Sequence, residues 1–148
     1  MDLFKKNSSN GLRKYFFVFS VLLFHSQFIY SKDLLSLLKD QVDAFNQQDV
    51  DKLVANVTED MKYFYITADE LIIETSGKAA FKQAMTNYFS TGNKPQSSIE
   101  SYVIDGTRIS FKEVINYKNK GGKTISSSAM GVYQYKDNKI IRAWYFIE

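Results

Sequence analysis

Alternation of apolar and polar side chains is clearest in the last stretch of the chain, where it predicts a β-hairpin. Two segments rich in aromatic and β-branched residues, Ser127–Tyr135 and Lys139–Ile147, flank a polar turn through Lys136, Asp137 and Asn138. Asp and Asn tolerate the left-handed backbone of such turns. Strand side chains alternate between faces, which places Ile141, Ala143, Tyr145 and Ile147 on one face and Ile140, Arg142, Trp144 and Phe146 on the other. Neither face is polar throughout, so we expect both sides of the hairpin to be covered, by helices and by a second subunit.

Helical periodicity marks three earlier segments. The first helix is predicted over Asp33–Gln47, with Asp33 as its N-cap. Leu34, Leu38 and Phe45 lie on one stripe of this helix, together with the polar Gln41. A second, short helix is predicted from Val50 to about Val57. A third is predicted from Lys78 to about Ser90, with burial expected at Phe81, Met85, Tyr88 and Phe89.

Four further segments have the composition of strands. They are Met61–Thr67, Leu71–Thr75, Ile99–Ile104 and Arg108–Lys118. The last two are joined by a turn at Asp105-Gly106, and Lys120 to Lys123 form the next turn. Helices that come first, followed by a run of antiparallel strands, predict an α+β domain with the helices packed on one face of a curved sheet.

The first 31 residues have the layout of a secretory signal. Lys5, Lys6, Arg13 and Lys14 form a basic start, and an uncharged apolar run from Tyr15 to Phe24 follows. This run is too short for a membrane-spanning helix, which needs about 20 residues. We therefore predict a signal peptide over residues 1–31 and one exported domain over residues 32–148, without stable membrane insertion after cleavage. An uncleaved N-terminal anchor is the alternative. The sequence does not distinguish a periplasmic from a secreted destination.

Charge and composition exclude several function classes. The chain's net charge of +3 lies entirely in residues 1–31, because residues 32–148 hold 15 basic and 15 acidic side chains. A neutral domain without a basic cluster does not predict nucleic-acid binding. The chain has no Cys, and its one His, His25, lies in the signal segment. Thiol chemistry, His-based catalysis and Cys or His metal sites are therefore excluded, and we expect neither a metal nor a cofactor.

Glu113 is the candidate catalytic residue. It interrupts an apolar row of the strand Arg108–Lys118 that also contains Ile109, Phe111, Ile115 and Tyr117. A carboxyl group on an inward face is costly to ionise, so burial raises its pKa and suits it to general acid–base chemistry. Two structural alternatives to a catalytic role remain for Glu113. In the first, its row of side chains faces outward at this point. In the second, Glu113 pairs with a cation such as Arg142 across the sheet.

Ligand contacts are predicted at polar-tipped and small side chains of the same inward faces. Gln41 either hydrogen-bonds a ligand or lies at the solvent edge of its helix. The tyrosines either line a pocket or are ordinary core and interface residues, and the small side chains of Ala129, Gly131 and Ala143 favour a cavity. The predicted ligand-binding residues are Gln41, Tyr63, Tyr65, Phe111, Gly131, Tyr133 and Tyr145.

The order of these elements resembles the SnoaL-like branch of the nuclear-transport-factor-2-like (NTF2-like) superfamily. The residues that carry the resemblance are Phe45 to Asp51, Glu59-Asp60, Ser76-Gly77-Lys78 and Asp137 to Ile140. The resemblance implies a cone, in which a strongly bent antiparallel sheet wraps about three helices around an apolar pocket, and in which dimers are common. The superfamily contains isomerases, cyclases, dehydratases, hydrolases and binding proteins, so the fold alone does not fix a function.

Comparison with two enzyme branches narrows the chemistry. In the ketosteroid isomerase branch a carboxylate base works with an oxyanion hole made by a Tyr and a protonated Asp. The corresponding positions here hold Tyr65, Gln41 and Gly131, so all three roles are lost. The SnoaL-type cyclases rely on an acid–base Asp and on His, and residues 32–148 contain no His.

The sequence therefore leaves three hypotheses. The first is an exported domain that binds a small, largely apolar molecule as a homodimer. The second is a lyase or isomerase that uses Glu113 as acid–base. The third is a protein-interaction subunit that docks through its aromatic sheet face. Trp144, Phe146 and Ile140, on the face of Arg142, are the predicted dimer surface.

Overall fold

The computed structural model describes residues 34–92, 94–119 and 121–147 of the chain. The predicted signal segment and the predicted N-cap Asp33 lie outside the described residues. Helices cover residues 34–46, Val50–Ala55 (α2) and Lys78–Ser90 (α3). The strands are Val57–Ile66 (β1), Leu71–Ser76 (β2), Gln96–Asp105 (β3), Arg108–Lys118 (β4), Thr124–Lys136 (β5) and Lys139–Phe146 (β6).

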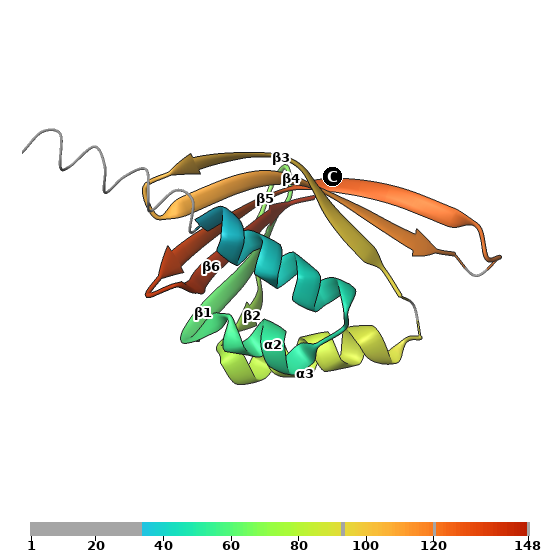
Figure 1. The fold of residues 1–148 in the computed structure, drawn as a ribbon, viewed down its shortest axis with the longest axis horizontal. Coiled ribbons are helices and arrows are strands. Elements are labelled where there is room, and N and C mark those ends of the chain that lie inside the picture. The colour runs from blue at the N-terminus through green and yellow to red at the C-terminus, as the bar shows by residue number, and fades with distance from the viewer. Residues whose placement is uncertain (1–33, 93, 120, 148) are drawn as a thin grey trace, which may run out of the picture.

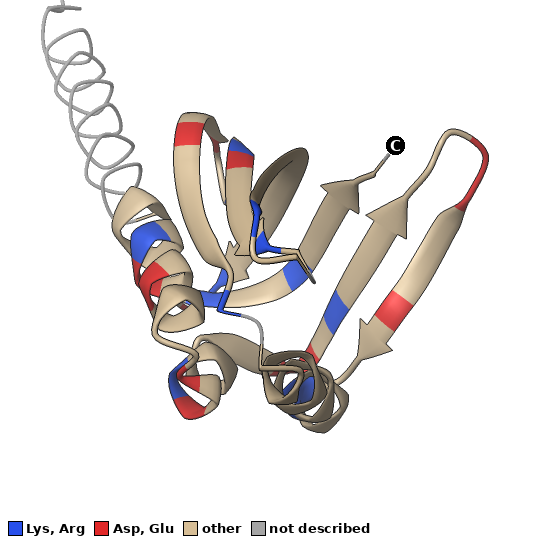
Figure 2. Ribbon diagram, turned by 90° about the vertical axis from the view of Figure 1, so that its right-hand side faces the viewer, with Lys and Arg blue, Asp and Glu red and all other residues tan. Residues whose placement is uncertain are grey.

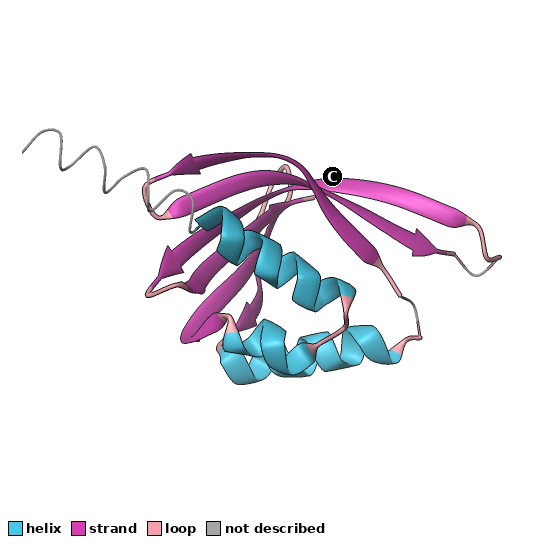
Figure 3. Ribbon diagram, in the orientation of Figure 1, coloured by secondary structure: helices cyan, strands magenta, loops and turns pink. Residues whose placement is uncertain are grey.

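The strands form one curved sheet with the helices gathered on one side of it (Figures 1 and 3). The strand order is β2-β1-β6-β5-β4-β3. All neighbours are antiparallel except β1 and β6, which run parallel. The predicted α+β class, with helices on one face of a bent sheet, is confirmed. None of the helices in the described ranges combines the length and the hydrophobicity that crossing a membrane requires.

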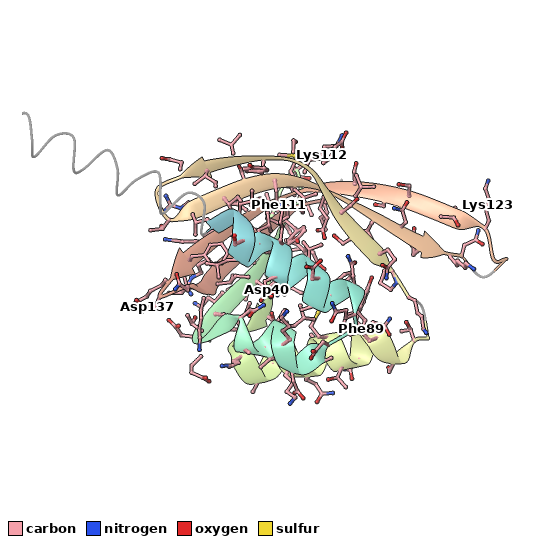
Figure 4. All side chains as sticks on the ribbon, viewed as in Figure 1. Asp40, Phe89, Phe111, Lys112, Lys123 and Asp137 are labelled. Carbon is pink, nitrogen blue, oxygen red and sulfur yellow. The ribbon has the colours of Figure 1, made fainter. Side chains whose placement is uncertain are left out.

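The core lies between the first helix and the concave face of the sheet. Leu34 and Leu38 from the predicted stripe are almost fully buried, as is Ala44, which the stripe did not include. On the sheet they meet Ile109 and Phe111 of β4, and Phe111 lies between the sheet and the first helix (Figure 4). Burial of this apolar stripe is what holds a helix of this length to the sheet.

The second helix is shorter than predicted, and β1 begins earlier. Asn56 caps the end of α2, and its backbone oxygen accepts a hydrogen bond of 2.9 Å from the Ile140 amide. The chain therefore enters the sheet directly after this bond, and the next residue, Val57, pairs with Ile140. The helix prediction through Val57 and the strand prediction from Met61 were therefore both wrong at this boundary.

The hairpin turn is as predicted, but one face of β6 is not. Asp137 and Asn138 both have positive φ, as a tight two-residue hairpin turn requires. The pairing of β5 with β6 then shifts, so that Ile141 is an extra residue between Ile140 and Arg142. This β-bulge turns Ile140 into the core, where it is 2% exposed. The prediction that Ile140 shares the outer face with Arg142 was therefore wrong.

Gly131 on β5 lies directly against the Phe111 ring. A Cβ atom at this position would lie 2.5 Å from Cζ and 2.6 Å from Cε2 of Phe111. The two residues pair directly across β4 and β5. The space freed by the missing side chain is thus occupied by an aromatic ring, which contradicts the expectation that Gly131 leaves cavity volume.

We predict that Gly131→Ala destabilises the domain by about 1–3 kcal/mol, because the ring is held on all sides and has to shift. Chemical denaturation measures the change. Gly121→Ala is the matched control, since its Cβ would meet only Asn119 Oδ1 at 3.4 Å and its stability should stay within a few tenths of a kcal/mol of the parent. Adding Phe111→Leu to Gly131→Ala should recover part of the loss. An unchanged free energy of unfolding in Gly131→Ala would contradict the assignment.

Candidate functional site

Aromatic side chains from four neighbouring strands meet on the concave face. The cluster comprises Tyr63 and Tyr65 of β1, Phe111 of β4, Tyr133 of β5 and Tyr145 of β6. The Tyr63 and Tyr145 rings stack with centroids 5.3 Å apart. Phe111 meets Tyr133 edge-on at 4.8 Å. The structure therefore brings together five of the seven residues predicted to bind a ligand. A sixth, Gly131, is in contact with one of these five, Phe111.

Glu113 lies beside this cluster and is 6% exposed. The Ser97 hydroxyl of β3 donates a hydrogen bond to Glu113 Oε1, and the nearby Tyr145 hydroxyl, like that of Ser97, lowers the pKa of the carboxyl group. Tyr133 Oη lies 2.9 Å from Tyr145 Oη. These two tyrosines share one hydrogen bond, in which either hydroxyl can be the donor. The hydroxyl groups of Ser97, Tyr145 and Tyr133 thus gather around one buried carboxylate.

Both structural alternatives for Glu113 fail. Its strand face is inward, since Ile109 and Phe111 of the same row are almost fully buried. Arg142 is not its partner, because the Arg142 guanidinium donates to the backbone oxygens of Asp60 at 3.0 Å and Ile141 at 2.6 Å.

The electrostatics of the site follow from burial. Burial raises the pKa of Glu113, and the hydrogen bonds from Ser97 and Tyr145 offset part of that rise. Burial also raises the pKa of Tyr63, Tyr133 and Tyr145, and the nearby charge of an ionised Glu113 adds to the rise. The tyrosines therefore keep their protons at neutral pH and serve as donors.

Ser97 is held in place by a side chain that the sequence did not single out. The Asn46 side chain, at the end of the first helix, donates to the Ser97 backbone oxygen at 2.9 Å and accepts from the Ser97 amide at 2.6 Å. Gln96 adds a bond of 3.2 Å to the Asn46 backbone oxygen. These contacts start β3 at Gln96, before the strand start predicted at Ile99. No local pattern links two residues that are 51 positions apart.

Gln41 belongs to a different polar group. It is 6% exposed, so the alternative that it lies at the solvent edge is wrong. Its Oε1 accepts from Asn56 Nδ2 at 2.9 Å, and the same nitrogen lies 3.1 Å from Asp40 Oδ2. Asp40 in turn forms an ion pair of 2.6 Å with Lys52. The oxygen of Gln41 thus fastens the first helix to the end of α2.

Partly exposed aromatic residues lie on the side of the site near α3. Tyr88 of α3 is 43% exposed, and its ring lies 6.0 Å from Phe45. Burial raises the pKa of Tyr88, and the charges of Tyr65 and Glu113 add to the effect. Phe89, visible at the end of α3 in Figure 4, packs 5.4 Å from Phe45. Of the predicted burial on α3, Phe81 is core, whereas Tyr88 is not.

Charged residues are distributed over helices and strands rather than gathered on one element (Figure 2). Within the described ranges, no three Asp, Glu, His or Cys side chains are grouped so that they could hold a metal ion. The chemistry that these residues can perform is hydrogen bonding and proton transfer at the Glu113 carboxylate.

Comparison with known proteins gives a family and a fold. The model of the SnoaL-like domain family matches residues 38–143. No curated protein matches the chain. Similar solved structures include an epoxide hydrolase from Mycobacterium tuberculosis that is described as LEH-like (14% identity, TM-score 0.65, covering 79% of this chain and 84% of that one). A putative polyketide cyclase from Xanthomonas campestris has 19% identity and a TM-score of 0.61, with 80% and 93% covered. A second Mycobacterium tuberculosis protein, in complex with estradiol-17β-hemisuccinate, has 15% identity and a TM-score of 0.64, with 78% and 94% covered. The resemblance to SnoaL-like and NTF2-like proteins is therefore confirmed, and the solved structures support the fold.

The pH dependence of stability tests the environment of Glu113. An acid whose pKa is higher in the folded than in the unfolded chain binds its proton more tightly when folded, so its contribution to stability is full at low pH. That contribution is lost as the pH rises from the ordinary value of 4.5 to the raised value. We therefore predict that the stability of the parent, relative to Glu113→Gln, falls over this window and then levels off.

Parallel denaturation series of the two proteins at several pH values measure this difference, and contributions from other groups cancel. Ser97→Ala is the informative companion. Because the Ser97 hydrogen bond lowers the pKa of Glu113, its removal should extend the window to higher pH. A difference that stays constant from pH 4 to 8 would contradict a raised pKa.

Proposed function

Because the chain belongs to the SnoaL-like domain family, we propose that it binds a small, largely apolar molecule between its helices and the concave face of its sheet. This proposal rests on one observation: the aromatic cluster lies next to a single buried polar network. Ligand sites combine a mostly apolar and aromatic lining with a few placed polar groups. Tyr63, Tyr65, Phe111, Tyr133 and Tyr145 provide the lining, and Glu113 with Ser97 provides the polar end.

Support also comes from a protein of the same fold, the Mycobacterium tuberculosis protein in complex with estradiol-17β-hemisuccinate. We place the entrance of the proposed site near Tyr65 and Tyr88, because both side chains keep part of their surface in solvent. The basic and apolar layout of residues 1–31 supports export to the periplasm or the medium, as the first step before the domain meets its ligand.

Acid–base catalysis at Glu113 is the second candidate. Lyases and isomerases use a carboxyl group with a raised pKa as acid–base, together with donors that stabilise a developing oxyanion. Here Glu113 has the raised pKa, and the neighbouring tyrosines are the donors. The two candidates can be separated by releasing the molecule that is bound to the purified protein and adding it back. A binding protein returns this molecule unchanged, whereas an enzyme returns it altered.

We predict that the protein, purified gently from its native host, carries a molecule of a few hundred daltons that is lost on denaturation, as native mass spectrometry would show. Ala129→Phe should remove it, because Ala129 pairs with Glu113 across the strands and packs against the core cluster. Ser128→Phe, one residue away and exposed, is the matched control and should retain the ligand. Equal retention in both variants would contradict the proposed position.

We further propose that the convex face of the sheet joins two copies of the chain. Phe64 and Trp144 stack there with ring centroids 5.7 Å apart. Phe146 and Met130 pair directly beside them and are 46% and 48% exposed. Lys112, the next residue across the sheet from Met130, lies on the opposite side from Phe111 (Figure 4). An apolar patch of this kind on a sheet, with polar residues at its rim, suits a two-fold interface.

Met130→Lys should convert the dimer to a monomer, because two lysines would be buried across the two-fold axis. Light scattering after size exclusion gives the mass directly. Gln83→Lys, an equal change of charge at an exposed position of α3 on the helical side of the sheet, should leave the dimer intact. A parent protein that is monomeric at high micromolar concentration would overturn this proposal, and the protein-interaction hypothesis would then take its place.

A further inference from the structure

The partners of Glu113 are all neutral. Ser97 of β3 donates a hydrogen bond to the carboxylate, and the neutral Tyr145 hydroxyl of β6 lies near it. The other ionisable groups near it are Tyr133, Tyr63 and Tyr88, contributed by β5, β1 and α3. An ionised Glu113 is therefore solvated by hydroxyl groups, but no positive charge in the part of the chain that the structure describes compensates it.

Several basic side chains of the described residues have partners elsewhere. The ion pairs found among the described residues join Lys52 to Asp40, Lys78 to Glu59, Lys82 to Asp51 and Lys112 to Glu100. Each of these pairs has partly exposed members. Arg142, the residue expected from the sequence to pair with Glu113, is bound to backbone oxygens instead.

A buried carboxylate without a counter-ion selects the charge of its ligand. An anion at this position would be repelled by Glu113, and a neutral molecule would leave the carboxylate uncompensated in a site of low dielectric constant. A cation compensates it. Tyrosine rings add to this preference, because the faces of aromatic rings attract organic cations.

From this arrangement we infer that the molecule held at the Glu113 site is an organic cation, with its amine or quaternary ammonium group beside the carboxylate and its apolar body against the tyrosines. The inference rests on the proposed ligand-binding function and adds the chemical class of the ligand. It accounts for the one feature that an apolar ligand leaves unexplained, a carboxylate in the middle of an aromatic lining.

Binding of such a ligand is linked to protons. The cation binds the ionised form of Glu113, whereas burial favours the protonated form in the empty site. Affinity for the cation therefore rises with pH until Glu113 is ionised in the free protein, and is constant above that point. Affinity for a neutral molecule of the same shape lacks this rise.

Two probes of equal shape test the inference, phenyltrimethylammonium and its neutral isostere tert-butylbenzene, with benzoate as the anionic probe. Ligand-detected NMR or calorimetry at pH 8 gives the affinities. We expect the parent to prefer the cation over the neutral isostere by about tenfold or more and to bind benzoate most weakly. In Glu113→Gln the preference should vanish, while tert-butylbenzene binding is retained.

Glu100→Gln is the matched control. Glu100 is an exposed carboxylate paired with Lys112, and its removal changes the net charge of the protein by the same amount. It should leave the preference for the cation unchanged.

The outcomes separate this inference from the function on which it rests. Equal binding of the two isosteres by the parent, or a cation preference that survives Glu113→Gln, overturns the inference and leaves the proposed ligand site standing. Failure of all three probes to bind, in a protein that also carries no ligand when purified, overturns both.

Discussion

The need to satisfy a buried carboxylate without a counter-ion is the constraint on which the site depends. Glu113 can ionise on the concave face only if hydroxyl donors replace the water that it has lost. Ser97 and Tyr145 supply them. Ser97 is in reach because Asn46 fixes the start of β3 against the first helix. Tyr145 is in reach because β6 lies between β1 and β5. Three separate parts of the chain therefore converge on one side chain.

The same packing that builds the core also sets the shape of the site. Gly131 leaves room for the far end of the Phe111 ring against β5, and this ring then contacts both Tyr133 and Tyr145. The bulge at Ile141 allows β6 to bury Ile140 near the hairpin turn and still direct Tyr145 to the concave face. Bulges re-aim side chains in this way without ending a strand.

Much of the fold could be predicted from periodicity and turn chemistry. The helical stripe at Leu34 and Leu38, the turn at Asp137-Asn138 and the inward position of Glu113 follow from local sequence, and each is confirmed. The partner of Glu113 could not be predicted. Alternation assigns a face but not a register, so Arg142 was as plausible as any other partner, whereas Ser97 is reached only through a contact with a distant helix. The bulge was missed because it shifts the alternation by one residue without a local signal.

Titration of the Glu113 carboxyl carbon by NMR, with Glu113→Gln used to assign the signal, tests the central claim that this is an uncompensated buried carboxylate which recognises its ligand. The account predicts a pKa above 4.5 in the free protein and a marked fall when phenyltrimethylammonium is bound. An ordinary pKa that does not change on addition of the cation would contradict it.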